Sequence, residues 1–249
     1  MAGVGSLVGR GLLVIVVLGM VLVGVSAGAV PVQRSAAAVP APPPASRPAV
    51  LRVMPLGASS TVGAGSPETA GYRGPLQALL ARDGVVVDMV GSQHGGPASV
   101  PDLDYEGYGG MTLEDLLPRV AGLVRRADPD VVLLHTGTND LLKGASAAES
   151  ARRLDAVIAR IVQVTDADVI VAGVWAPLSG DTRDRTEFER LAAGVVAGFR
   201  ERGHPVRYAD TSGLLEPDEL ADGLHPNAAG YRVIAAMWER QILDVRNHP

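Results

Sequence analysis

From residue 51 onward, short apolar runs of strand length alternate with longer segments in which apolar residues recur at helical spacing. The apolar runs predict five β-strands, at residues 51–56, 85–90, 131–135, 169–173 and 206–209. The helical spacing predicts intervening helices at residues 72–82, from 112 onward, at 146–165 and 186–202, and from 226 to near the end of the chain. This alternation indicates an α/β three-layer sandwich around a five-stranded parallel sheet.

Three of these elements carry further local signals. The run at residues 131–135 is apolar apart from its last residue, His135, which is typical of a strand buried on both faces. Thr112 followed by Asp115 predicts a capping box at the start of one helix, and Pro118 predicts a kink shortly after it. Pro226 is expected to open the last helix, where a missing N–H costs nothing.

The N-terminal region has a different composition. Residues 11–33 carry no charge, follow Arg10 and end near Ala27-Gly28-Ala29, a pattern that predicts a secretory signal peptide at residues 1–29. An uncleaved membrane anchor is the alternative, because about 20 apolar residues can span a bilayer. Residues 30–50 are rich in Pro and Ala and predict a semi-extended linker. Residues 51–249 then form one predicted domain, in a protein that is secreted or faces outward from the cell surface.

Charge and cysteine content exclude several classes of function. The chain has 22 basic and 27 acidic residues, a net charge of −5, and no basic stripe, so nucleic acid is not an expected partner. It has no cysteine, which excludes a disulfide framework, a thiolate nucleophile and a Cys-ligated zinc. His94, His204 and His248 stand alone without metal-ligand spacing, so no metal is predicted.

Four residues in three distant segments are the candidate catalytic groups. Ser59 follows the first predicted strand, Asn139 follows the third, and Asp222 and His225 follow the fifth. Ligands of open parallel sheets bind at the carboxyl ends of the strands, so all four are expected at one edge. Serine becomes a nucleophile when a histidine accepts its proton, and a carboxylate orients that histidine. Asparagine can hold the oxyanion of an acyl-transfer intermediate.

The serine segment differs from other Gly-rich signatures. Thr61 stands where a nucleophile elbow, Gly-x-Ser-x-Gly, has its second glycine. The Gly-Lys-Ser/Thr ending of a phosphate-binding loop is missing, and Gly63-Ala64-Gly65 lacks the third glycine of a dinucleotide fingerprint. An ordinary strand-to-helix turn is the remaining alternative.

Six ordered blocks resemble the SGNH (GDSL-type) hydrolase family. They are Met-Pro-Leu-Gly-Ala-Ser-Ser-Thr at 54–61, Gly-Tyr-Arg at 71–73, Val-Asp-Met-Val-Gly-Ser at 87–92, Glu-Gly-Tyr-Gly-Gly at 106–110, Gly-Thr-Asn-Asp at 137–140 and Asp-Gly-Leu-His-Pro-Asn at 222–227. The second, third and fourth blocks resemble the acetylxylan-esterase-like branch of the family. The resemblance runs from about Val53 to the last helix and implies a flavodoxin-like three-layer α/β/α sandwich.

The resemblance also implies a role for each matching residue. Ser59 would be the nucleophile, His225 the base and Asp222 its orienting partner. The N–H groups of Ser59 and Gly110 and the side chain of Asn139 would form the oxyanion hole. No metal or organic cofactor is implied.

One residue departs from the family pattern. The usual Gly-Asp-Ser has become Gly57-Ala58-Ser59, so the acid beside the nucleophile is absent. That acid does not belong to the triad, and its loss is expected to affect the nucleophile turn or specificity. It also leaves open the alternative of a weak or inactive homologue.

Other residues near the predicted site have simpler expectations. Tyr108, Met111 and Trp175 are candidate pocket-lining residues, with core packing as the alternative. His135 is expected to be a hydrogen-bonded core histidine, with a ligand as the alternative. Asp140 is expected to cap the helix that follows it, with substrate contact as the alternative.

Another pair of acidic residues raises a different chemistry. Asp104 and Glu106 could suggest the paired carboxylates of a glycosidase. They are expected in a loop that the esterase interpretation already explains.

These observations predict a secreted serine esterase that hydrolyses small acyl esters, acetyl groups on a polysaccharide being the first choice. The partner is then an ester substrate such as an acylated glycan, with a membrane tether through the N-terminal segment as a further option. The alternatives are a lipid-directed esterase or thioesterase with the same residues, and a carbohydrate-binding or envelope module with weak catalysis.

Overall fold

The computed structural model describes residues 50–175 and 182–248, all within one compact unit that spans Ser46–Pro249. The predicted signal peptide and the predicted linker up to residue 49 lie outside the described residues. Within the described ranges, no helix is both long enough and apolar enough to cross a membrane.

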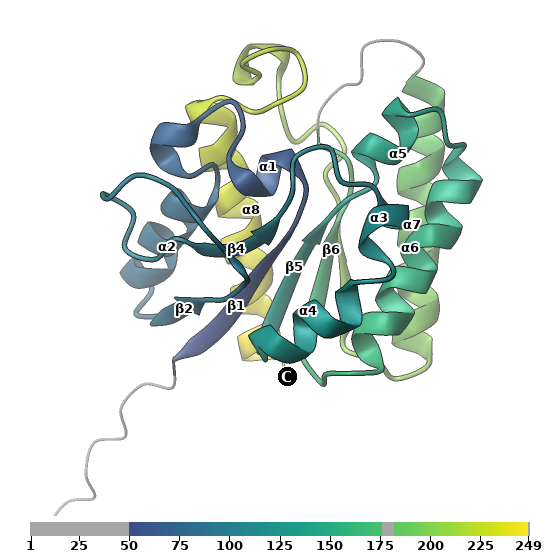
Figure 1. The fold of residues 1–249 in the computed structure, drawn as a ribbon, viewed down its shortest axis with the longest axis horizontal. Helices are drawn as coiled ribbons and strands as arrows, with labels where there is room; N and C mark the ends of the chain where they lie inside the picture. The colour runs from purple at the N-terminus through teal and green to yellow at the C-terminus, as the bar shows by residue number, and fades with distance from the viewer. Residues whose placement is uncertain (1–49, 176–181, 249) are drawn as a thin grey trace, which may run out of the picture. The chain divides into compact units, whose positions relative to one another are not determined.

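A mostly parallel sheet forms the centre of the domain (Figure 1). Its strands are β1 (Leu51–Gly57), β2 (Val87–Met89), β3 (Gln93–His94), β4 (Asp104–Gly107), β5 (Val131–His135), β6 (Asp168–Ala172) and β7 (Val206–Ala209). The order is β3-β4-β1-β5-β6-β7, and β2 also pairs with β1. The fold class predicted from the sequence is confirmed.

The sheet contains two short strands beyond the five that the sequence predicts. The two added strands are β3 and β4. β4 pairs with the last residues of β1, on the same edge where β2 pairs with its first residues. β3 pairs with β4 in the antiparallel direction. β3 has two residues and is too short for a periodic signal, and β4, Asp-Tyr-Glu-Gly, lacks the apolar residues that marked the equally short β7. Asp104 and Glu106, which were expected in a loop, therefore lie in β4.

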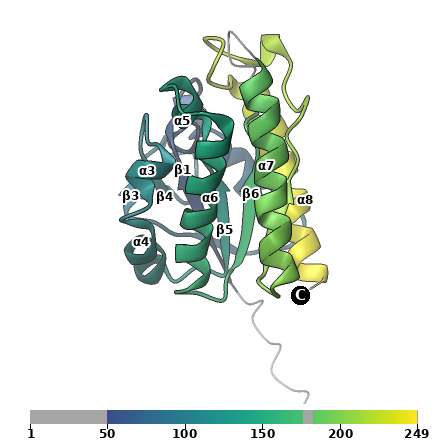
Figure 2. The same ribbon diagram turned by 90° about the vertical axis from the view of Figure 1, so that its right-hand side faces the viewer.

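Helices cover both faces of the sheet, as the two views in Figures 1 and 2 show. On one face, α2 (Arg73–Arg82) and α8 (Ala228–Asn247) pack against alternate residues of β1, β5 and β6. On the other face lie α3 (Leu113–Leu116), α4 (Val120–Ala127), α6 (Ala147–Val162) and α7 (Thr182–Glu201). Side chains along a strand alternate between faces, so Leu133 enters the first layer and Leu134 the second.

The remaining elements are short and lie around the strand ends. They are α1 (Ser59–Val62), α5 (Thr138–Leu142) and two 3₁₀ turns, η1 (Pro67–Thr69) and η2 (Pro217–Glu219). Because α1 directly follows β1 and α5 directly follows β5, both stand at the carboxyl edge of the sheet.

Local signals set several helix ends. The capping box of Thr112 and Asp115 is confirmed: each side chain accepts a hydrogen bond from the other residue's backbone N–H. Pro118 separates α3 from α4, so the expected kink is a full interruption. The start of the last helix is corrected. Asn227 caps α8 by accepting hydrogen bonds from the N–H groups of Ala229 and Gly230, and Pro226 precedes this cap.

Candidate active site

The nucleophile turn is formed where β1 passes directly into α1. Ser59 is the first residue of α1, and Ala58 is its N-cap. Gly57 closes the strand beside β5, and a Cβ at this position would lie 2.4 Å from the His135 carbonyl oxygen. Only glycine allows this close approach, which holds the serine turn against the neighbouring strand.

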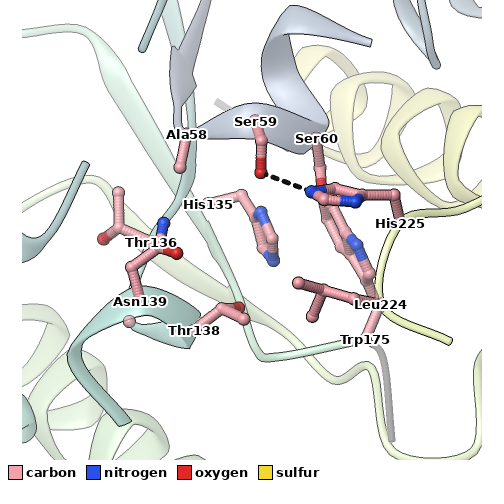
Figure 3. A pocket seen from close by; sticks show the side chains of 11 residues that line it. Ala58, Ser59, Ser60, His135, Thr136, Thr138, Asn139, Trp175, Leu224 and His225 are labelled. Carbon is pink, nitrogen blue, oxygen red and sulfur yellow. Dashed lines mark hydrogen bonds between the residues drawn. The ribbon is translucent and has the colours of Figure 1, made fainter. Parts of the chain in front are cut away.

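Three side chains form a continuous hydrogen-bonded chain. Ser59 Oγ lies 2.9 Å from His225 Nε2 (Figure 3). On the other side of the ring, His225 Nδ1 lies 2.8 Å from Asp222 Oδ2. The hydrogen bond from His225 lowers the pKa of Asp222 to about 2, so this carboxylate is ionised at neutral pH. An ionised Asp222 requires the hydrogen on Nδ1 and leaves Nε2 to accept the serine proton. The sequence-predicted Ser59, His225 and Asp222 are thus brought together.

The backbone of the histidine segment adds to this arrangement. Asp222 Oδ1 accepts the N–H groups of Leu224 at 3.0 Å and His225 at 2.7 Å. One carboxylate therefore holds both the ring and the backbone of the histidine. Gly65 joins this segment to the serine turn, because a Cβ there would lie 2.4 Å from the Pro226 carbonyl oxygen. Its φ of +90° is a second reason for glycine.

Asn139 lies on α5, across the same cavity from Ser59 (Figure 3). Its Nδ2 donates one hydrogen bond to the Met111 carbonyl oxygen at 3.0 Å. A side-chain amide has two N–H groups, so the second remains for a ligand. The Met111 side chain is buried in the core of the α6 layer, and its backbone is what touches the site.

Gly110 lies on the exposed turn before Met111, with a φ of +74°. Its carbonyl oxygen accepts a hydrogen bond from Lys143 Nζ at 3.0 Å. Gly110 is not among the residues that line the cavity of Ser59 and Asn139. Its role in an oxyanion hole stays a prediction.

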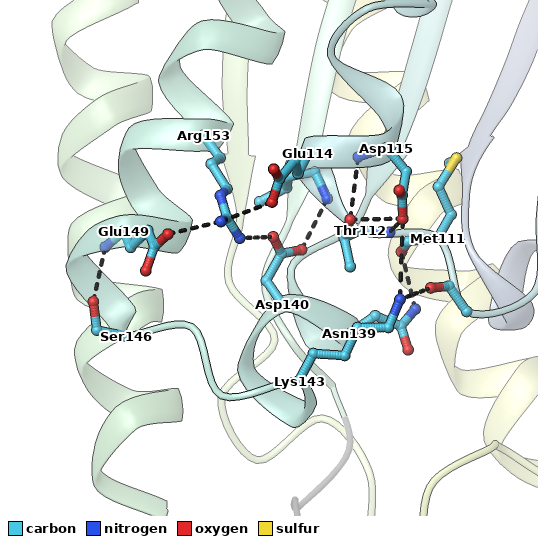
Figure 4. A network of polar contacts seen from close by, with 12 residues as sticks. Met111, Thr112, Glu114, Asp115, Asn139, Asp140, Lys143, Ser146, Glu149 and Arg153 are labelled. Carbon is cyan, nitrogen blue, oxygen red and sulfur yellow. Dashed lines mark hydrogen bonds and ion pairs between the residues drawn. The ribbon is translucent and has the colours of Figure 1, made fainter.

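Asp140 connects the helix of Asn139 to the segment that begins at Met111 (Figure 4). Its buried carboxylate accepts the Leu113 N–H at 2.8 Å and a hydrogen bond from Arg153 at 3.1 Å. Burial raises the pKa of Asp140, and these two donors act in the opposite direction. The expectation that Asp140 caps the helix after it is wrong. Its carboxylate accepts the N–H of Leu113, the first residue of α3, which lies earlier in the chain, and Ser146 caps α6.

His135 and Trp175 form the wall of the cavity opposite Asn139. Their rings stack with centroids 3.2 Å apart and planes 8° apart, and both side chains are buried. Neither ring nitrogen of His135 has a hydrogen-bond partner among the described residues, and burial lowers its pKa to about 3. The prediction of a hydrogen-bonded core histidine is therefore wrong.

The three predicted pocket residues differ in where they lie. Trp175 lines the cavity, whereas Tyr108 and Met111 are not among its lining residues. The Tyr108 hydroxyl donates to Glu106 at 2.5 Å, and its ring lies 4.2 Å from the Arg119 guanidinium carbon. A part of Tyr108 and Met111 in substrate binding stays a prediction.

The sequence model of the GDSL-like lipase/acylhydrolase family matches residues 56–233. This stretch contains the nucleophile turn, α5 and the Asp222–His225 segment. The chain belongs to this family. It is accordingly a carboxylic ester hydrolase, and the resemblance seen in the sequence is confirmed.

Two solved structures and a curated relative are similar to this chain. A family 3 carbohydrate esterase from Clostridium thermocellum is 30% identical, with a TM-score of 0.72 over 80% of this chain and 98% of the other. A carbohydrate esterase of family 3 from Talaromyces cellulolyticus shares the fold at 24% identity, with a TM-score of 0.70 over 80% of this chain and all of the other. A multidomain esterase from Ruminococcus flavefaciens is 28% identical over 225 residues, which are 77% of this chain. The matched part spans only 28% of that relative.

Sequence reasoning missed one buried group that supports the acylhydrolase site. Arg73 is 1% exposed and donates hydrogen bonds to the carbonyl oxygens of Thr61 and Val62, at the end of α1. Its guanidinium also stacks over the Tyr105 ring at 4.0 Å. The last carbonyls of a helix have no partner within it, so Arg73 stabilises the four-residue helix that carries Ser59. The Gly-Tyr-Arg block at residues 71–73 was the available signal.

Proposed function

We propose that this domain is a secreted serine esterase that removes small acyl groups, acetyl in particular, from a polysaccharide. The observation that carries the proposal is the chain of contacts from Ser59 through His225 to Asp222, beside the cavity that Asn139 lines. Similarity to a carbohydrate esterase at 30% identity supports a glycan as the alcohol. The apolar N-terminal segment supports secretion.

In the first half of the reaction, Ser59 Oγ attacks the ester carbonyl carbon while His225 Nε2 accepts the hydroxyl proton. The carbonyl π bond opens to an oxyanion. The C–O bond to the alcohol then breaks, and His225 returns its proton to the leaving alkoxide. The products are an acyl-serine and a free sugar hydroxyl.

In the second half, water attacks the acyl-serine and His225 Nε2 accepts a proton from it. The bond between the acyl carbon and Ser59 Oγ breaks, and the proton goes to the serine oxygen. A carboxylic acid is released. Asp222 remains ionised in both halves and stabilises the imidazolium.

Three donors are assigned to the oxyanion. The Ser59 N–H is the first of α1 and has no acceptor within that helix. Asn139 has one amide N–H that is not used by Met111. The Gly110 N–H completes the hole by the resemblance alone. Such donors stabilise the transition state because they are already aligned where charge develops.

A hydrolysis panel tests this proposal directly. The full chain is assayed on p-nitrophenyl esters of increasing acyl length and on acetylated xylan and chitin fragments, with Ser59→Ala as the control. Release of acetate that depends on Ser59 supports the proposal. If the chain hydrolyses no ester and a serine-directed phosphonate leaves Ser59 unlabelled, the domain is not a serine esterase.

A further inference from the structure

The cavity beside Ser59 has a reactive side and a closed side. The reactive side carries Ser59, Asn139 and His225 (Figure 3), and the closed side is the part lined by the buried, stacked rings of His135 and Trp175. The cavity has a volume of about 20 Å³. A space of about that size accommodates roughly one water molecule. The cavity therefore accommodates the methyl group of an acetyl ester and excludes a longer acyl chain.

The two halves of an ester must lie on different sides of Ser59. The alcohol oxygen has to receive its proton from His225, whose ring is partly exposed, with a side-chain exposure of 21%. A sugar alcohol is far larger than the closed cavity, so it has to extend toward solvent. The acyl chain is then directed to the closed side, toward the two stacked rings.

We infer, on the basis of the proposed esterase function, that the His135–Trp175 stack is the end wall of the acyl pocket and limits the acyl group to two carbons. This assigns to His135 a role in specificity, through its volume and position and without any proton transfer.

The position of His135 makes the wall rigid relative to the nucleophile. His135 is the last residue of β5 and pairs in register with Gly57, two residues before Ser59. The strand pair thereby sets the distance between the wall and the serine. On its other side the imidazole rests on Trp175, which is 2% exposed. A wall fixed by a sheet cannot move aside for a longer chain without disturbing the β1–β5 pair.

The chemistry of His135 fits a wall better than an acid or base. Both ring nitrogens are buried and lack a partner among the described residues. Burial keeps the ring neutral, because it lowers the pKa to about 3. A buried polar side chain without partners destabilises the fold, and such groups concentrate at functional sites. Replacing it with an apolar residue removes no hydrogen bond in the described part of the chain.

The test compares acyl-length preference in wild type, His135→Ala and Trp175→Ala. The readout is the ratio of kcat/KM for p-nitrophenyl acetate to kcat/KM for p-nitrophenyl butanoate. Both rates are measured on one sample, so the ratio does not depend on the fraction of folded enzyme. A wild type that prefers acetate, and a ratio that falls at least about tenfold in both variants, supports the inference.

Two further variants separate the wall from a general loss of packing. His135→Leu keeps the side-chain volume, and its ratio is expected to stay within about threefold of wild type. Leu134→Ala removes a buried side chain from the same strand on the opposite face, away from the cavity. It is expected to lower the melting temperature and leave the ratio unchanged. If His135→Ala does not fold, Trp175→Leu enlarges the pocket at the other ring of the wall, and its ratio is measured instead.

The outcomes distinguish this inference from the function on which it rests. A wild type that hydrolyses butanoate as fast as acetate, or a ratio unmoved by both wall variants, overturns the inference. The esterase proposal survives that result if Ser59→Ala is inactive. A wild type that hydrolyses no ester overturns both.

Discussion

The two sides of the active site are held in place in different ways. On the base side, Asp222 and His225 are three residues apart and Asp222 is 56% exposed, so local contacts suffice. On the oxyanion side, the carboxyl group of Asp140 is fully buried and binds Leu113, 27 residues away, and Arg153, 13 residues away. We therefore expect substitutions on the base side to affect catalysis alone, and substitutions on the oxyanion side to affect both catalysis and stability.

The largest effect is expected from the nucleophile. Ser59→Ala removes the attacking oxygen and one hydrogen bond to a partly exposed ring. We expect kcat to fall by about 10⁴-fold or more while the melting temperature stays within about 2 °C. Steady-state kinetics and thermal unfolding of the same preparation check both parts. A variant that retains more than a tenth of its activity contradicts the assignment of Ser59.

Asn139→Ala tests the first residue on the oxyanion side. It removes an oxyanion donor and the hydrogen bond to the Met111 carbonyl oxygen. We expect kcat to fall by about 10²–10³ with KM changed by less than about threefold. Unlike Ser59→Ala, it should also lower the free energy of unfolding, by about 1 kcal/mol. Wild-type kcat in this variant would remove the side chain from the oxyanion hole.

Arg153→Met tests whether the buried network positions the oxyanion side. The change leaves the buried Asp140 carboxylate with backbone N–H donors alone, and it also breaks ion pairs with Glu114 and Glu149. We expect the free energy of unfolding to fall by about 1–3 kcal/mol and kcat to fall several-fold with little change in KM.

The matched control for this variant is Arg152→Met. Arg152 is the neighbouring arginine on α6 and is exposed. Arg152→Met should leave the free energy of unfolding and kcat unchanged. Arg153→Lys should show a smaller loss of kcat than Arg153→Met. A large loss of stability without any change in kcat would mean that the network supports the fold and does not position Asn139.

The smallest expected effect is a pH dependence of the free energy of unfolding. It arises from His135 and involves neither the base side nor the oxyanion side of the active site. The pKa of His135 in the folded protein is about 3, below the value of about 6.5 for an unfolded histidine. Between these pH values the unfolded chain binds more protons. Acidification therefore lowers the free energy of unfolding, by up to about 1.4 kcal/mol per pH unit from this group. Above about pH 6.5 the group contributes no pH dependence.

Urea unfolding of wild type and His135→Leu at intervals from pH 4 to 8 checks this. The variant should show a shallower slope below about pH 6.5. Leu134→Val, which shortens a buried side chain of the same strand and changes no titratable group, is the control with the wild-type slope. Equal slopes in wild type and His135→Leu would show that His135 is not held neutral by burial.

Local sequence signals determined the elements and the base side of the site. The apolar run of β5, the capping box of Thr112 and the interruption at Pro118 each depend on interactions within a few residues, and all are present in the structure. The spacing of Asp222 and His225 is of the same kind, since a single turn brings the two side chains into contact.

Only the tertiary structure decided the contacts between distant segments. Ser59 and His225 are 166 residues apart and meet because two strands of one sheet end at the same edge. The partners of Asp140, the His135–Trp175 stack and the short strands β3 and β4 leave no periodic trace. The two kinds of contact differ in the distance along the chain over which their interactions act. Propensity and capping act over one or two turns of chain, whereas burial and hydrogen bonding between segments depend on how whole layers pack.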